Sequence, residues 1–195
     1  MFEEPEGATP LTADERAGLK HDHIATREQL NELEAANITA GLVWLDRSRG
    51  DVLSDVFLAR VHKRLFGDVW AWAGSFRQRK VNIGNVPPYE IGVQLRYLVD
   101  DTRLWVTDNV YSPLEAAARF HHRLVQIHPW PNGNGRHARI TADRLLTQCF
   151  GHPSIDWEGG DELQVEGVRR DRYIEALRAA DGYDFEPFLS FVGAV

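Results

Sequence analysis

The sequence predicts an all-α, mainly helical protein with a single domain and one short hairpin or extended flap. Three observations lead to this prediction. Helix-capping patterns recur along the chain, apolar residues between them follow the helical period, and one stretch alone is rich in β-forming residues, Gly and Pro. A chain of 195 residues can bury one sizeable core, so one domain is the default expectation.

The start signals place the individual helices. Thr12 with Glu15, and Thr26 with Gln29, match the reciprocal capping box, and residues 112–115 (Ser-Pro-Leu-Glu) supply a cap, a first-turn proline and a capping acid. Apolar residues then recur at roughly the helical period in the segment that Thr26 opens. We expect helices over about 26–46, 54–66, 89–106, 113–127, 136–150, 168–180 and 185–193.

Residues 75–88 (SFRQRKVNIGNVPP) interrupt the helical pattern. They mix β-forming residues with Gly and two prolines, which is typical of a short hairpin or an extended flap. We expect Trp70 and Trp72, just before this stretch, to lie in the core, because large aromatic rings stabilise by burial. Residues 1–11 are rich in Glu and Pro and predict a flexible lead-in, so the domain is expected to span 12–195.

Composition excludes several classes of protein. The net charge of -7 argues against a general nucleic-acid binder, although it leaves room for a local basic pocket. A single cysteine, Cys149, excludes an internal disulfide and fits a reducing compartment. The sequence has no apolar run of membrane-spanning length, and its acidic N-terminus has no signal-peptide core. We therefore expect a cytoplasmic protein without membrane or nucleic-acid partners. The sequence is compatible with a homo-oligomer but does not decide the oligomeric state.

The most informative segment is residues 128–139, His-Pro-Trp-Pro-Asn-Gly-Asn-Gly-Arg-His-Ala-Arg. Gly133 and Gly135 allow positive φ and leave room for a ligand, and the backbone N–H groups before a helix form an anion site. Arg136 and Arg139 add two guanidiniums that suit a di- or triphosphate. His128, at the end of the preceding helix, can accept a proton at neutral pH. The segment therefore predicts a phosphate site beside a general base.

This segment resembles the motif of the Fic family, which reads His, any residue, Phe, any residue, Asp or Glu, then Gly-Asn-Gly-Arg, two residues and Arg. Trp130 replaces the Phe conservatively. The similarity extends to residues 120–128 and to the flap around residues 82–87, and it covers a core of roughly 50–180. The whole chain, including TREQLNELEAANI at 26–38, resembles the Fic subgroup called mobile mystery protein B. The motif positions that match are His128, Gly133, Asn134, Gly135, Arg136 and Arg139.

The resemblance implies a mainly helical Fic fold and an AMP-transferring enzyme. In this family the motif histidine, here His128, deprotonates a Ser, Thr or Tyr hydroxyl of a target protein, whose oxygen attacks the α-phosphorus of ATP. The loop implied to bind the nucleotide comprises Gly133, Asn134, Gly135 and Arg136, and Arg139 is implied to bind the γ-phosphate. The flap is implied to pair with the target as an added strand. Its residues here are Lys80, Val81, Asn82, Ile83 and Gly84.

Position 132 departs from the family pattern. Asn132 stands where most Fic enzymes carry the Asp or Glu that holds Mg²⁺ on the ATP phosphates. An amide still offers a carbonyl oxygen, so we expect a weaker metal site for Mg²⁺, with Mn²⁺ as an alternative. The same change motivates a second hypothesis, a nucleotide-binding regulator with little catalysis. A Doc-like phosphotransferase is a third, which the intact Gly135-Arg136 pair disfavours.

Other charged residues have two interpretations each. Many Fic proteins carry an inhibitory helix whose Glu pairs with the second motif arginine. Glu34 is the candidate here, but its flanking residues do not match that pattern, and an exposed helix acid is the interpretation we favour. Asp143 either orients Arg139, four residues away, or forms an ordinary surface pair with it. His121 and His122 are expected to be packing or surface residues, because with His128 they do not share one helical face.

Overall fold

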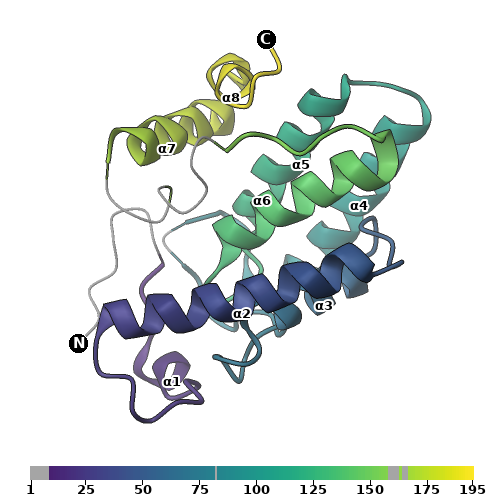
Figure 1. Cartoon of the computed structure of the whole chain (residues 1–195). Helices are drawn as coiled ribbons and strands as arrows, with labels where there is room; N and C mark the ends of the chain where they lie inside the picture. Colours follow the sequence, from purple (N-terminus) through teal and green to yellow (C-terminus); the bar gives the residue numbers. More distant parts are fainter. Residues whose placement is uncertain (1–8, 82, 158–162, 164–166) are drawn as a thin grey trace.

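The computed structural model describes residues 9–81, 83–157, 163 and 167–195, and most of these residues lie in helices (Figure 1). The elements are α1 (Ala13–Arg16), α2 (Arg27–Arg47), α3 (Asp55–Phe66), η1 (Pro88–Glu90), α4 (Ile91–Thr107), α5 (Pro113–Ile127), α6 (Asn134–Leu145), the π-helical turn η2 (Leu146–Phe150), α7 (Val168–Asp181) and α8 (Glu186–Phe191).

The long helix α2 packs along α3 at one side of the molecule (Figure 1). Thr26 opens α2 with a capping box, because its side chain accepts from the Gln29 backbone while the Gln29 side chain accepts from the Thr26 backbone. Between the two helices lies a first hydrophobic cluster. Its buried members are Leu11, Leu30, Leu45, Phe57, Val61, Leu65, Phe66, Val69, Trp70 and Ala73.

A second, larger cluster joins α4, α5, α6, α7 and α8. Helix α5 packs between α4 and α6, and α7 and α8 pack on each other at the opposite side of the molecule from α2 (Figure 1). The turn between α5 and α6 therefore lies in the middle of the fold. None of the described helices combines the length and the hydropathy that a membrane-spanning segment requires.

The structure confirms the all-α prediction and each expected helix, with shifts of a few residues at the ends. Both ends shift at α6: the helix begins at Asn134 instead of residue 136, because Gly133 adopts the left-handed conformation and serves as N-cap, and it ends at Leu145, with residues 146–150 in the π-helical turn η2. Trp70 is 2% exposed, in agreement with the expected core position, and Trp72 is partly buried against the same cluster.

Two other segments differ from expectation in detail. Of the β-hairpin and the extended flap that we considered for residues 75–88, the hairpin is not seen, because no strand pair is assigned among their described members. The described residues of this stretch are extended up to Pro87, and Pro88 begins η1. At the end of the expected flexible lead-in, Thr9 and Leu11 are buried at 4% and 7% exposure. Residues 9–11 thus pack against the body of the protein, while residues 1–8 lie outside the described residues.

Candidate active site

His128 ends helix α5 in an unusual backbone conformation. Its φ of 49° and ψ of 61° lie in the left-handed region, and its N–H donates to the Leu124 carbonyl at 3.1 Å. A left-handed residue other than Gly costs roughly 1–2 kcal/mol and persists where the surrounding structure enforces it. The chain therefore turns sharply at His128 and directs the following residues back into α6.

The loop after His128 is held by side chains of its own neighbourhood. The Asn134 side chain bridges the loop, since its Oδ1 accepts from the Trp130 N–H at 3.0 Å and its Nδ2 donates to the Trp130 carbonyl at 2.8 Å. From α3, the fully buried His62 ring contacts the Asn132 carbonyl through Nε2 at 3.1 Å and stacks on Trp130 at 4.5 Å. At Gly133 a Cβ would come within 2.7 Å of the Phe66 ring, so the loop needs glycine there.

Arg77 fixes the end of α5 from the other side. Its guanidinium is buried and donates to the carbonyls of His128 at 2.6 Å, Ile127 at 3.2 Å and Val86 at 2.6 Å. The backbone N–H of Arg77 donates to the Pro129 carbonyl at 2.9 Å. The last carbonyls of a helix lack intrahelical partners, so Arg77 satisfies them and positions His128.

The His128 ring is 6% exposed, and both of its nitrogens have partners. Nδ1 lies 3.2 Å from the Val125 carbonyl and Nε2 lies 2.8 Å from the Thr9 hydroxyl. Burial lowers the pKa of His128 from 6.5 to about 4, the Val125 hydrogen bond opposes that shift, and the Arg77 and Arg79 guanidiniums add to it. His128 is therefore neutral at pH 7, and its nitrogen facing the hydroxyl can accept a proton.

Arg136 of α6 forms an ion pair with Glu34 of α2. Its Nη1 lies 2.5 Å from Glu34 Oε2, while Glu34 Oε1 accepts from the Trp70 indole at 2.7 Å. Glu34 is 5% exposed, so our favoured interpretation of an exposed helix acid is wrong. The alternative also needs correction, because Glu34 contacts the first motif arginine, Arg136, and not Arg139.

Arg139 and Asp143 do not form the expected pair. Arg139 is 7% exposed, and its guanidinium lies over the Tyr173 ring of α7 at 5.8 Å. Asp143 instead accepts from the Trp157 indole at 3.0 Å and from the Ile155 N–H at 3.0 Å, and burial raises its pKa to about 6. Among the ion pairs of the described residues, none joins a carboxylate to Arg139.

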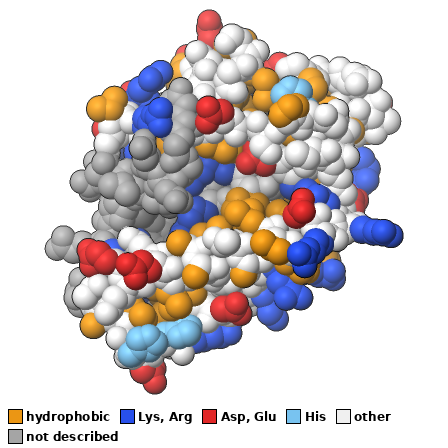
Figure 2. Space-filling model, viewed as in Figure 1, with side chains coloured by type: hydrophobic (Ala, Val, Ile, Leu, Met, Phe, Trp, Pro, Cys, Tyr) orange, Lys and Arg blue, Asp and Glu red, His pale blue; other side chains and the backbone are white. Residues whose placement is uncertain are grey.

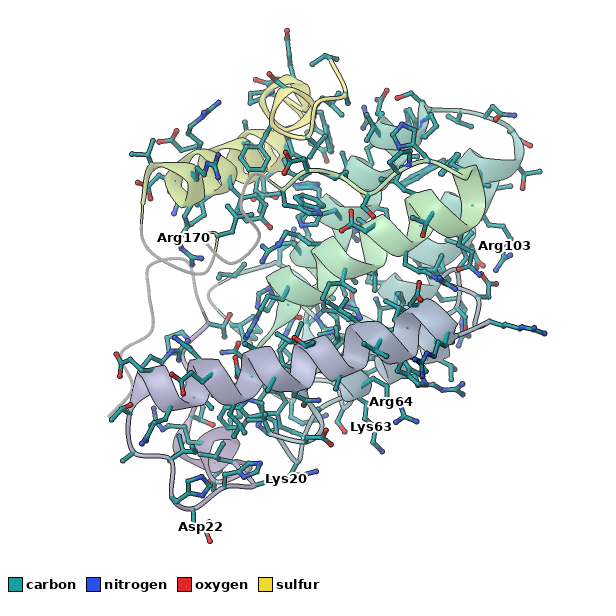
Figure 3. All side chains as sticks on the ribbon, in the orientation of Figure 1. Lys20, Asp22, Lys63, Arg64, Arg103 and Arg170 are labelled. Carbon is teal, nitrogen blue, oxygen red and sulfur yellow. The ribbon has the colours of Figure 1, made fainter. Side chains whose placement is uncertain are left out.

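The motif residues converge on one cavity of about 300 Å³. In Figure 2, Lys and Arg side chains gather in a hollow between α2 and the α7–α8 layer. Figure 3 shows Arg170 extending from α7 toward this side of the fold. The lining includes residues from the motif loop, α6, α7 and both N-terminal and flap segments, among them Thr9, Ile83, His128, Asn132, Gly133, Asn134, Gly135, Arg136, Arg139, Arg170 and Tyr173.

The family model described as Fic/DOC family matches residues 52–146, which span the whole motif loop and both helices around it. The chain carries a Fic domain. It is 26% identical over 195 residues to the protein adenylyltransferase Fic of Aedes aegypti, and 29% identical over 199 residues to the protein adenylyltransferase fic-1 of Caenorhabditis elegans. In both comparisons the match covers 96% of this chain but 37% of the relative, so the chain spans little more than a third of their length.

Solved structures share the fold of this Fic domain. Residues 134–508 of C. elegans Fic-1 match with a TM-score of 0.67 and 27% identity, covering 90% of this chain and 51% of that one. The BepC protein of Bartonella tribocorum, solved with bound AMPPNP, matches with a TM-score of 0.66 and 20% identity, covering 97% and 93%. At that identity the second match concerns the fold alone.

The described flap residues of the Fic domain differ in their distance from the cavity. Ile83 lines the cavity, and Gly84 lies against the end of α5, where a Cβ would come within 3.2 Å of His128 Cβ. Lys80 is exposed and Val81 is half-buried, and neither belongs to the lining. Asn82 lies outside the described residues.

The residues of the Fic motif fit a protein-held metal ion poorly. Asn132 Oδ1 accepts from the Gly133 N–H at 2.6 Å, so the one side-chain oxygen at the position of the expected ligand already has a partner. Within the described parts of the chain, no three His, Cys, Asp or Glu side chains are grouped as a metal site. A Mg²⁺ ion prefers carboxylate oxygens and substrate phosphates, and only the phosphates would be strong ligands here.

Sequence reasoning missed three residues that shape the Fic site. His62 and Arg77 are single polar residues in otherwise ordinary segments, and only their complete burial distinguishes them. Thr9 is separated from His128 by 119 positions, and no local pattern connects the two. Buried polar side chains that bond to backbone carbonyls carry no periodic signal, so a chain pattern alone could not find them.

Proposed function

We propose that this chain transfers the AMP group of ATP to a Ser, Thr or Tyr hydroxyl of a target protein, with His128 as the general base. One observation carries the proposal. A neutral His128 presents Nε2 to an aliphatic hydroxyl at 2.8 Å, on the edge of a cavity lined by arginines. A general base must lie within about 2.6–3.2 Å of the group that it deprotonates, and His128 meets this condition.

The hydrogen bonds of the ring assign its tautomer. A carbonyl can only accept, so His128 Nδ1 carries the hydrogen that points to the Val125 carbonyl. In a neutral imidazole the other nitrogen then has a lone pair, which faces the hydroxyl. In the proposed reaction the proton of the acceptor hydroxyl moves to His128 Nε2 as the hydroxyl oxygen bonds to the α-phosphorus and the bond to the leaving pyrophosphate breaks.

The start of α6 supports nucleotide binding beside this base. The free N–H groups at a helix N-terminus favour anions, and Gly133 and Gly135 leave them uncovered. Arg136 and Arg139 lie on the same cavity, so both can reach phosphate oxygens. Asn134 lines the cavity, but its side chain is hydrogen-bonded to the backbone of Trp130. We therefore propose that this side chain shapes the loop and that the backbone N–H of Asn134 binds phosphate.

The relatives support the type of chemistry. The two curated relatives are named protein adenylyltransferases, and the match with each covers nearly all of this chain. ATP as the donor and a protein as the acceptor follow from that likeness as proposals. Mg²⁺, or Mn²⁺, would be held chiefly by the ATP phosphates, with Asn132 as a weak contact. A cytoplasmic location and the oligomeric state stay predictions of the sequence.

A labelling experiment tests the proposal. The protein is incubated with ATP labelled at the α- or the γ-phosphate in a lysate of its source. Label transferred to protein from the α position alone supports AMP transfer, and it should disappear with His128→Ala, since loss of a general base costs about 10²–10⁴-fold. Label from the γ position alone would mean phosphoryl transfer and would overturn the proposal.

A specific observation favours a second function. The Glu34–Arg136 ion pair and the missing carboxylate at Asn132 both suit a nucleotide-binding regulator with little catalysis. In the labelling experiment this function predicts retained ATP binding and no labelled protein from either position. Repeating the experiment with Glu34→Gly separates a locked enzyme, which gains activity, from a regulator, which stays inactive.

A further inference from the structure

A hydroxyl group of this chain, that of Thr9, lies against the proposed general base His128. Thr9 Oγ1 lies 2.8 Å from His128 Nε2, and the two residues are 4% and 6% exposed. Because Nδ1 of the ring donates to the Val125 carbonyl, Nε2 of the neutral ring must accept, and the Thr9 hydroxyl is the donor. The Thr9 hydroxyl thus directs its proton at His128 Nε2. An acceptor hydroxyl must lose this proton when its oxygen attacks a phosphorus atom.

Several contacts hold Thr9 in this place. Leu11, two residues later, is buried in the cluster between α2 and α3. On the flap, Arg79 donates to the Pro10 carbonyl at 2.5 Å and forms an ion pair with Glu15 at 2.9 Å. Glu15 in turn completes the capping box of Thr12, so residues 9–15 are fastened to the flap as one unit.

The flap is the segment to which the resemblance assigns target docking. Arg79 of this flap binds the backbone of residue 10 directly beside Thr9, as it could bind the backbone of an extended target. Thr9 also lines the same cavity as Arg136 and Arg139, so its hydroxyl and the proposed phosphate site share one space. The N-terminal segment thus lies against the flap, the proposed base and the proposed phosphate site together.

We propose that Thr9 is an intramolecular acceptor and that the protein adenylylates itself at this hydroxyl. The inference rests on the proposed function, because ATP is the donor. The Thr9 oxygen bonds to the α-phosphorus, its proton moves to His128 Nε2, and the bond to the β-phosphate oxygen breaks to release pyrophosphate. A tethered acceptor that is already aligned reacts at a high effective concentration. The reaction is therefore unimolecular and adds at most one AMP per chain at Thr9.

The test uses the full chain and α-labelled ATP with Mg²⁺, followed by trypsin and fragment-ion mass spectrometry. The peptide that ends at Arg16 contains Thr9 and Thr12 as its only hydroxyl side chains, which makes Thr12 the internal control. We expect AMP on Thr9 and none on Thr12, with a rate constant that does not change over a tenfold range of protein concentration. Thr9→Ser should retain the label, and Thr9→Val should reduce it to the level of His128→Ala.

The outcomes separate this inference from the proposed function. Each variant is also tested on lysate proteins and in a Glu34→Gly background, which removes the partner of Arg136. If lysate proteins are labelled while Thr9 stays unmodified, the inference is overturned and the proposed function stands. If no variant transfers α-label to any protein, the proposed function fails and the inference with it. Label on Thr9 whose rate rises with protein concentration would overturn the intramolecular reaction.

Discussion

Removing the charge of Glu34 should activate nucleotide binding. The carboxylate lies 2.5 Å from Arg136 Nη1 and is held by the Trp70 indole at 2.7 Å, in a setting where Glu34 is 5% exposed. A phosphate that binds Arg136 must displace this carboxylate or share the guanidinium with it. A hydrogen bond to a charged group contributes about 1.5–3 kcal/mol, which corresponds to roughly 10–150-fold in apparent ATP affinity.

Glu34→Gln is the informative variant. It keeps the size of the side chain and an oxygen for the Trp70 indole, and it replaces the charged oxygen that faces Arg136 by a neutral amide group. We expect tighter ATP binding by calorimetry and faster self-labelling from α-labelled ATP. Glu32→Gln is the matched control, because Glu32 is an exposed acid on the same helix and should change neither quantity.

Stability must be followed in parallel, since Arg136 loses its ion-pair partner. A thermal unfolding midpoint close to that of the parent protein would show that the gain in affinity comes from the site and not from a loosened fold. Equal ATP affinities for Glu34→Gln, Glu32→Gln and the parent, with all three folded, would refute the reasoning. The buried pair would then serve to join α2 to α6 and not to restrict the nucleotide.

Four further predictions follow from the site. Because burial lowers the pKa of His128 to about 4, the pH profile of kcat/KM should stay level as pH falls through 6.5 and decline only near pH 4, and a decline centred at 6.5 would contradict the buried neutral base. Arg139→Ala should weaken ATP by about 1.5–3 kcal/mol in calorimetry and AMP much less, if the γ-phosphate is its partner. Asn132→Asp keeps the acceptor for the Gly133 N–H and adds a charge, so it should lower the Mg²⁺ concentration for half-maximal rate, whereas superimposable titrations would remove this residue from the metal site. Arg77→Ala leaves buried carbonyls without a donor, and denaturant titration should show a loss of about 3–5 kcal/mol in unfolding free energy.

The local signals of the sequence predicted the helices well. The capping boxes at Thr12 and Thr26 and the proline that opens α5 lie where expected, because caps depend on neighbours three residues apart. The flap was harder to predict. Arg77 bonds through its side chain to the Val86 carbonyl and through its backbone to Pro129, so residues that could have paired as a hairpin are joined by a side chain instead.

Long-range contacts account for what the sequence could not predict at the site. Helix α2 buries a stripe that includes polar residues, Glu34 and Asn37 among them, so hydropathy alone does not reveal its inner face. Asn37 donates to the Arg64 carbonyl and Glu34 reaches Arg136, 102 positions away. The motif itself was visible because its residues are adjacent in sequence, whereas their partners come from separate helices.

The contact between Glu34 and the Trp70 indole links tryptophan fluorescence to the occupancy of the Arg136 site. Indole emission responds to hydrogen bonding at its N–H and to nearby charge. The Glu34 carboxylate supplies both to Trp70. Its ring also stacks on Trp72 at 5.0 Å, so the two chromophores respond together. Any ligand that draws Glu34 away from Arg136 would alter the emission of this pair. Nucleotide occupancy could then be followed in solution without a label, by the intrinsic fluorescence of the unmodified chain.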